Sequence, residues 1–295
     1  FPSALQYGLT VVAVAAQSTF VAKYATDGTQ LSQEERLMDT VSISGQICHS
    51  VCPDGQGGGY AWISHPALNN IFEVYVFHFD SEGHNTISAP TGLIASQPDG
   101  QNFHSIPFAA FHPGSHDLLV TFVEVDALSQ TRNGFRVNRI TPDGTKLWGD
   151  GGIAVIPMTD EEDLSVPYID AFPDGTGASI AYKLNDKSVV AFGIDANGTV
   201  TWHTTLSTPA DDYNISMCDA TSGYHNGQTI LAWQGSRNNT LGLYGQNLHQ
   251  DGTLGPSSES SVEDAENSVL TIYQSSDCIH IVGSDIQQVE LVNMA

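Results

Sequence analysis

The sequence predicts an all-β fold, a six-bladed β-propeller, because three separate markers recur along the chain with a period of about 50 to 60 residues. The first marker is a strand-like segment followed by Asp-Gly, Glu-Gly or Asn-Gly. Such a pair is typical of a β-hairpin, since these residues accept a positive φ angle. The glycines of this marker are Gly28, Gly83, Gly144, Gly198 and Gly252.

The second marker is a serine followed by an apolar residue and then Pro, Cys or Leu. Phe1-Pro2 fits as a further copy that lacks the serine. The other copies begin at Ser50, Ser105, Ser165, Ser216 and Ser268. Six repeats of about 52 residues therefore start near residues 2, 52, 107, 167, 218 and 270, within a single domain over residues 1–295.

The third marker is an aromatic residue that closes the second strand of a repeat, at Trp62, Phe122, Tyr182 and Trp233. Each repeat then consists of a strand, a Gly-rich turn, a strand, a variable loop, a strand, an Asp-Gly turn and a short fourth strand. The segment from Ser32 to Asp39 is the only helix candidate, and it falls where a fourth strand belongs.

The sixth repeat is short, because the chain ends after QVELVNMA without an Asp-Gly turn. Either the sixth blade has three strands, or residues before Phe1 supply its outer strand. A solenoid is the alternative architecture, but it would need capping ends that the sequence does not show.

The charge of the chain excludes several classes of partner. It has 33 acidic and 9 basic residues, a net charge of −24. Nucleic acids and anionic membranes bind clustered Lys and Arg, so neither is an expected partner. The longest apolar run, Leu9 to Ala16, is too short to span a bilayer.

The expected location is secreted, periplasmic or cell-surface. The chain opens at Phe1 without a methionine, which indicates that a leader has been removed, and its strands are rich in Ser, Thr, Asn and Gln. The four cysteines, Cys48, Cys52, Cys218 and Cys278, form no CxxC pair and no disulfide framework, so we expect buried thiols.

The repeat resembles the blades of secreted bacterial β-propeller repeat proteins. The resemblance is carried by the turn CPDGQGGG at Cys52–Gly59, by Trp62, and by IDANGTVTW at Ile194–Trp202. It covers the whole chain but consists of turn and core residues, so it implies the architecture and no particular activity. The Asp-box of sialidase-like propellers is not matched, since Asp195 and Gly198 stand three residues apart instead of two.

The sequence favours a binding or scaffold propeller that recognises a carbohydrate or a protein partner. The repeats are near-equivalent, and no nucleophile elbow, P-loop or dinucleotide fingerprint is present. Ligand contacts in such a fold come from the loops between the second and third strands and from the start of the first strand. The candidate ligand-binding residues are His49, His65, His104, Asp126, Asp163, Asp186, Asn214 and Arg237.

Two other functions stay open. A carbohydrate-active enzyme would use an acid pair on the same face, with Asp126, Asp160 or Asp163 as candidates, since glycoside hydrolysis needs two carboxyl groups. The second of these functions is that of a structural domain in a larger envelope protein. No cofactor is predicted except Ca²⁺, for which Asp160, Glu161 and Asp163 are candidate ligands if their acidic run is more than a solvated loop.

Overall fold

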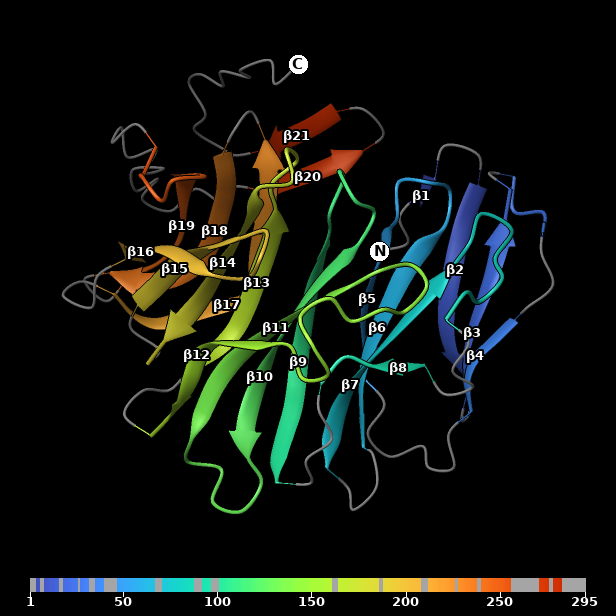
Figure 1. The fold of residues 1–295 in the computed structure, drawn as a ribbon. Coiled ribbons are helices and arrows are strands. Elements are labelled where there is room, and N and C mark those ends of the chain that lie inside the picture. Colours follow the sequence, from blue (N-terminus) through green and yellow to red (C-terminus); the bar gives the residue numbers. More distant parts are fainter. Residues whose placement is uncertain are drawn as a thin grey trace. The chain divides into compact units, whose positions relative to one another are not determined.

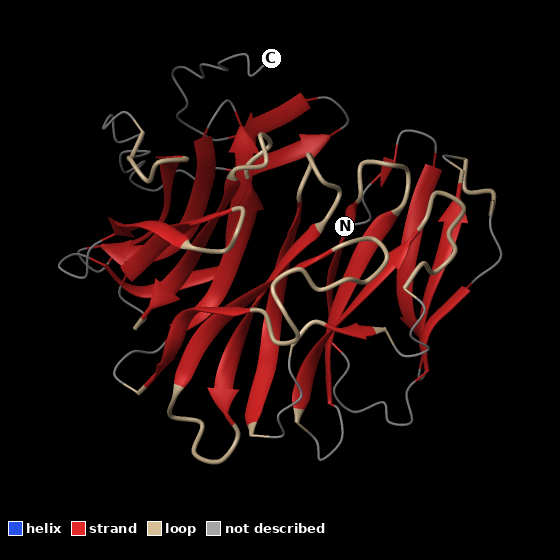
Figure 2. Cartoon of the chain, in the orientation of Figure 1, coloured by secondary structure: helices blue, strands red, loops and turns tan. Residues whose placement is uncertain are grey.

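The computed structural model of the chain describes residues 4–5, 8–15, 18–25, 27–31, 35–39, 47–66, 71–87, 92–96, 101–160, 164–185, 188–207, 212–225, 228–237, 240–255, 271–275 and 278–282. Every regular element among them is a β-strand (Figures 1 and 2). This described part contains no helix that could cross a bilayer. The chain divides into two compact units, Phe1–Pro256 and Ser257–Ala295.

Within its described residues, the first unit holds five consecutive antiparallel sheets, and the strands of each sheet follow one another in chain order. The first sheet contains β1 (Ala4–Leu5), β2 (Gly8–Ala15), β3 (Ser18–Tyr24) and β4 (Glu35–Asp39). The second contains β5 (Ile47–Pro53), β6 (Gly59–Pro66), β7 (Phe72–Phe79) and β8 (Leu93–Ile94). The third contains β9 (Asn102–Phe111), β10 (Leu118–Asp126), β11 (Asn133–Ile140) and β12 (Ile153–Thr159).

The fourth sheet contains β13 (Leu164–Ala171), β14 (Gly177–Leu184), β15 (Ser188–Asp195) and β16 (Val200–Ser207). The fifth contains β17 (Asp212–His225), β18 (Gln228–Arg237) and β19 (Thr240–His249). In the second unit, the described residues form one antiparallel hairpin of β20 (Thr271–Ser275) and β21 (Cys278–Val282).

The predicted all-β class with antiparallel sheets is confirmed. The repeat starts near residues 52, 107, 167 and 218 each fall inside the first strand of a sheet. Strand β4 occupies most of the helix candidate Ser32–Asp39, where the repeat places a fourth strand. Six closed blades, the repeat length and a single domain stay predictions.

Successive sheets of the first unit pack face to face, because their central strands are apolar on both sides. In β10, Val120 and Phe122 belong to the core shared with sheet β5–β8. Leu119 and Val123 belong to the core shared with sheet β13–β16. Side chains of a strand alternate between its faces, so one central strand contributes to two cores and its sequence is a nearly continuous apolar run.

Two further cores have the same form. One joins β1–β4 to β5–β8 and includes Val21 and Phe77, and the other joins β13–β16 to β17–β19 and includes Ala191 and Trp233. The first strands of neighbouring sheets also lie against one another, β5 against β9, β9 against β13 and β13 against β17. The sheets are therefore stacked in sequence order, with their first strands on the same side.

The second and third sequence markers face each other across the sheets. Two residues of β9, Ile106 and Pro107, lie opposite Phe122 alone, and two residues of β13 lie opposite Tyr182 alone. Strands β9 and β13 thus bulge where they meet a large buried aromatic side chain. The proline of β9 occupies a bulge position that needs no ladder hydrogen bond. Ile106 adopts a φ angle of 51°, which is unusual for a β-branched residue.

The five repeated glycines close one kind of turn, as predicted. Their φ angles lie between 82° and 90°. In each turn the glycine N–H donates to the carbonyl three residues earlier, and that earlier residue's N–H donates to the carbonyl just after the glycine. This is a type I turn followed by a left-handed glycine, a common way to join two antiparallel strands.

These turns also connect neighbouring sheets. The carbonyl at the second position of four turns accepts a hydrogen bond from a side chain of the preceding sheet. Thr86 donates to Pro142 at 2.8 Å, Arg139 to Ala196 at 3.3 Å, and the Trp202 indole to Gln250 at 2.6 Å. Lys23 donates to Ser81 in the same way. The turns therefore fix the stacking of the sheets as well as the reversal of the chain.

Cys52 is a free thiol beside the core of its sheet. Burial, together with the charge of Asp54, raises the pKa of Cys52 to about 12. A thiol held in its neutral form is a poor nucleophile and metal ligand. Cys52 is partly buried, and the expectation of fully buried thiols stays a prediction. The side chains of Cys48, Cys218 and Cys278 lie outside the described part.

Alanine at two equivalent turn glycines should cost different amounts of stability. Gly28→Ala adds a Cβ with no atom within 4 Å, so only the left-handed conformation opposes it, at about 1–2 kcal/mol. Gly252→Ala brings the Cβ to 2.6 Å from the Trp202 ring, and overpacking adds about 1–3 kcal/mol. Urea unfolding followed by tryptophan fluorescence should show the larger loss for Gly252→Ala, and equal losses would contradict the packing of Trp202 on this turn.

Candidate functional site

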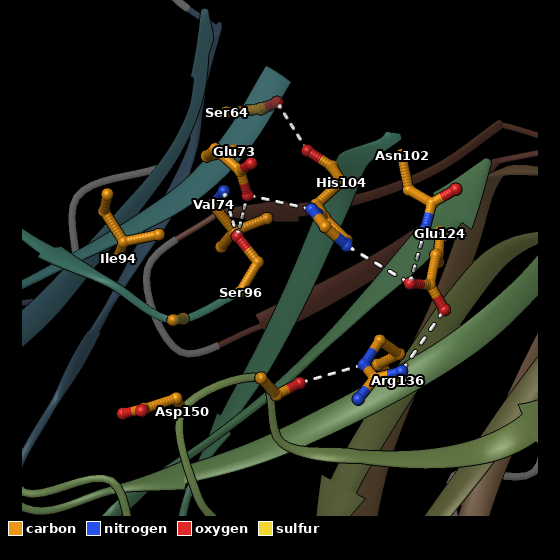
Figure 3. Close-up of polar contacts among 12 residues, drawn as sticks. Ser64, Glu73, Val74, Ile94, Ser96, Asn102, His104, Glu124, Arg136 and Asp150 are labelled. Atoms are coloured by element: carbon orange, nitrogen blue, oxygen red, sulfur yellow. Dashed lines mark hydrogen bonds and ion pairs between the residues drawn. The ribbon is translucent and has the colours of Figure 1, made fainter. Parts of the chain in front are cut away.

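A buried network of charged side chains joins the sheets β5–β8 and β9–β12 at one end of their strands (Figure 3). Glu73 and His104 are each 1% exposed, and Glu124 is 7% exposed. Charged groups are rarely buried to this degree unless they are paired. We call the set Glu73, Ser96, His104, Glu124 and Arg136 the charge network.

The strand register brings these residues together. Glu73 lies near the start of β7, and His104 lies near the start of β9 in the next sheet. Glu124, near the end of β10, is directly opposite His104 in the antiparallel pairing. Since β7 also packs against β9, carboxylates from two sheets reach one imidazole.

The imidazole of His104 has a carboxylate on each ring nitrogen. Nδ1 lies 2.8 Å from Oε2 of Glu73, and Nε2 lies 3.4 Å from Oε1 of Glu124. Both nitrogens can donate at once only when the ring is protonated. Burial alone would lower the pKa of His104, but the hydrogen bonds and charges of Glu124 and Glu73 outweigh it and raise the pKa to about 9.

Glu124 is held ionised on its other side. Nη1 of Arg136 donates to Oε2 at 3.3 Å, and the amide of Asn102 donates to Oε1 at 3.3 Å. Burial by itself would raise the pKa of Glu124, but the His104 hydrogen bond and the Arg136 charge lower it below its usual range. Arg136 in turn donates to the carbonyls of Gly151 and Gly152.

Glu73 is fixed within its own sheet. The Ser96 hydroxyl donates to Oε2 of Glu73 at 2.5 Å and accepts the N–H of Val74 at 3.2 Å. Two carboxylates, one imidazolium and one guanidinium give the charge network no net charge. Its polar atoms are directed at protein partners, and a fully paired network of this kind stiffens the structure around it.

Three of the predicted ligand-binding residues lie at this end of the strands. His104 is the centre of the charge network, and His65 is buried directly opposite Glu73 in the β6–β7 pairing. Asp126 closes β10 and accepts the backbone N–H groups of Ser129, Thr131 and Arg132 at 2.7–3.1 Å. Asp126 thus holds the β10–β11 loop in shape.

The other predicted residues are placed only in part. His49, Asn214 and Arg237 lie on β5, β17 and β18, and their side chains are outside the described part. Asp160 is exposed just after β12. Glu161, Asp163 and Asp186 lie outside the described residues. Among the described residues, no three His, Cys, Asp or Glu side chains are arranged to hold a metal ion. The Ca²⁺ site stays a prediction.

Sequence reasoning missed Glu73, Ser96, Glu124 and Arg136. The signal for two of them was present. Glu73 is the only carboxylate in FEVYVFHF, and Glu124 lies between two valines in LLVTFVEVD. A carboxylate flanked by apolar residues in a strand that is buried on both faces needs a partner, and that need could have indicated the site.

No protein-family model matches the sequence, and no curated protein is significantly similar to it. Solved structures that share features with the chain include glycoside hydrolases. An endo-arabinase from Bacteroides thetaiotaomicron is 11% identical over 82% of this chain and 89% of its own, with a TM-score of 0.42. A β-xylosidase is 11% identical over 86% of this chain and 93% of its own, with a TM-score of 0.44. These similarities are too distant to assign a family or a reaction to the chain.

Removing the central imidazole should be strongly destabilising. His104→Gln leaves buried carboxylates with too few donors, and breaking a buried ion pair costs about 3–5 kcal/mol. His84→Gln is the matched control, because the His84 side chain is 71% exposed, and such surface changes stay within about 0.5 kcal/mol. Urea unfolding at pH 6 measures both. A loss for His104→Gln no larger than that of the control would contradict the charge network.

Proposed function

We propose that the chain is a β-propeller that binds a carbohydrate at the end of the strands where the charge network lies. The stacking of five consecutive sheets, each sharing a core with the next, supports the propeller. An extracytoplasmic location is part of the same proposal. In this proposal the charge network lies beneath the surface that binds the ligand. It would hold the strand ends in place without contacting the ligand.

The observation that carries this proposal is the ionisation of the acidic groups. Among the described residues, every carboxyl whose pKa departs from its ordinary value has a lowered pKa, because hydrogen bonds from the protein outweigh burial. These carboxyls are Asp27, Asp54, Asp80, Glu124, Asp126, Asp143, Asp174, Asp195 and Asp251. Glycoside hydrolysis needs one carboxyl with a raised pKa as general acid. A surface that only binds a carbohydrate needs no carboxyl group with a raised pKa.

A neutral, hydroxyl-rich ligand suits this end of the strands. His49 on β5 and Asn214 on β17 occupy bulge positions near the starts of first strands, where the pairing with the second strand shifts. Bulges redirect side chains and are frequent beside binding sites. Imidazole and amide groups pair with sugar hydroxyls, whereas the net charge of −24 disfavours anionic polymers.

A second candidate is hydrolysis of a glycosidic bond. The observation in its favour is that Glu73 and Glu124 approach one point from two sheets. Two carboxyl groups on either side of a small space are what such enzymes use. In this chain the imidazole of His104 fills that space, and a hydrolase would need it to be vacated.

Calorimetric titration with oligosaccharides of arabinose, xylose and galactose, combined with product analysis, tests the proposal. We expect saturable binding and no cleavage. Asn214→Ala should weaken the affinity at least tenfold, which corresponds to about 1.4 kcal/mol. Asn197→Ala, in an exposed turn at the other end of its strands, is the matched control and should bind like the unmodified protein.

The possible outcomes separate the candidates. Release of reducing sugars would support hydrolysis and contradict a binding-only role. Absence of binding across the panel would contradict carbohydrate recognition. Equal weakening by Asn214→Ala and Asn197→Ala would contradict the assignment of the ligand to this end of the strands.

A further inference from the structure

We propose that Asn197, on the turn between β15 and β16, is a site of N-linked glycosylation. The acceptor sequence for this modification is an asparagine, then any residue except proline, then serine or threonine. Asn197, Gly198 and Thr199 match it. The modification belongs to proteins that leave the cytoplasm, so the inference rests on the extracytoplasmic location in the proposed function. It does not depend on whether the chain binds a carbohydrate.

The turn holds the Asn197 side chain in solvent, while the residues on either side of it face the preceding sheet. Asn197 is exposed. The carbonyl of Ala196 accepts a hydrogen bond from Arg139 at 3.3 Å. A Cβ atom on Gly198 would lie 1.9 Å from Cδ1 of Ile153, on β12. The turn is therefore anchored through its other residues, and a glycan on Asn197 would extend into solvent.

The turn does not need the Asn197 side chain to cap its backbone. In three equivalent turns the residue before the glycine accepts the N–H of the threonine two residues later, at 2.9–3.1 Å, and these acceptors are Asp27, Asp143 and Asp251. In the turn of Asn197, the N–H of Thr199 is accepted by Asp195 at 2.8 Å. The N–H of Asn197 is accepted by the same oxygen at 2.9 Å. Modification of the Asn197 amide therefore leaves the backbone cap intact.

The chemistry of the transfer is compatible with the contacts of this amide. The side-chain nitrogen of Asn197 bonds to the anomeric carbon of a sugar, and the bond from that carbon to a lipid-linked pyrophosphate breaks. The pyrophosphate lipid leaves, and the amide releases one hydrogen as a proton. The pKa of Asp195 is lowered by hydrogen bonds, first from the backbone of Thr199 and then from the backbone and side chain of Asn197. The second amide hydrogen remains, so the side-chain contact can persist.

The structure distinguishes Asn197 from the two other copies of the acceptor sequence, which begin at Asn214 and Asn238. Asn214 lies within β17, between residues that pair with β18, and its side chain is outside the described part. Residue 238 also lies outside it. Asn197 is the copy that the described part of the chain places in an exposed turn. Its turn lies at the end of the strands opposite the charge network, so a glycan there leaves the proposed binding end free.

Mass spectrometry of the chain secreted from a eukaryotic host tests the site. Asn197 is the sole asparagine between residues 188 and 207, so an N-linked glycan on a peptide limited to this range can only be attached there. We expect the peptide to carry a glycan that a peptide amidase removes. A secreted, folded protein whose peptide carries no such glycan would overturn the proposal. Carbohydrate binding does not enter this readout, so a failure here is distinct from a failure of the proposed function.

Three variants identify the acceptor. Asn197→Gln removes the amide that is modified, and Thr199→Val removes the hydroxyl group that the acceptor sequence requires. Both variants should lose the glycan. Thr199→Ser keeps the hydroxyl and is the matched control, which should still be glycosylated. A glycan that persists on this peptide in Asn197→Gln or Thr199→Val, or its absence from Thr199→Ser, would contradict the proposal.

Discussion

Burial of the central strands on both faces is the constraint on which the rest of this structure depends. A strand such as β10 gives alternate side chains to two cores, and so it has no polar face. Any charge placed on it must find its partner inside the protein. Glu124 meets that requirement with His104 and Arg136, and His104 needs Glu73 from the next sheet. The charge network is thus a consequence of the stacking as well as a support for it.

The repeated turns serve the same stacking. Left-handed glycines return the chain tightly, which leaves the carbonyl at the second turn position pointing out of the hairpin. Donors from the preceding sheet, including Thr86 and Arg139, use those carbonyls. The turns that recur at regular intervals in the sequence therefore also help to set the spacing between sheets. The donors differ from one interface to the next, and the hydroxyl of Thr86 also contacts the ring of His78.

Much of the fold was predictable from the sequence, because it depends on local rules. The five turns follow from glycines that accept positive φ, and the strands follow from the apolar runs between them. The bulges were not predictable, although the serine marker recorded their position, because a bulge is defined by the partner strand. The aromatic residues opposite them, such as Phe122 and Tyr182, explain why the two markers keep a fixed distance.

The candidate site was harder to predict, since it joins residues that are distant in sequence. His104 was identified from its place in the repeat, but its partners Glu73 and Glu124 come from two other strands and one other sheet. The position of a residue in the repeat predicts which end of a strand it occupies. It does not predict which side chains pack against it. The same limit applies to His65, whose neighbour Glu73 is fixed by the register of a hairpin.

The central claim is that His104 is an imidazolium that neutralises two buried carboxylates. The most direct test is nitrogen-15 NMR of the His104 ring, which separates a doubly protonated imidazole from either neutral tautomer. At pH 7 we expect both ring nitrogens of His104 to carry a hydrogen, with conversion to the neutral form near pH 9. A neutral ring at pH 7 would contradict the account, because one of the two buried glutamates would then have no hydrogen bond from the imidazole.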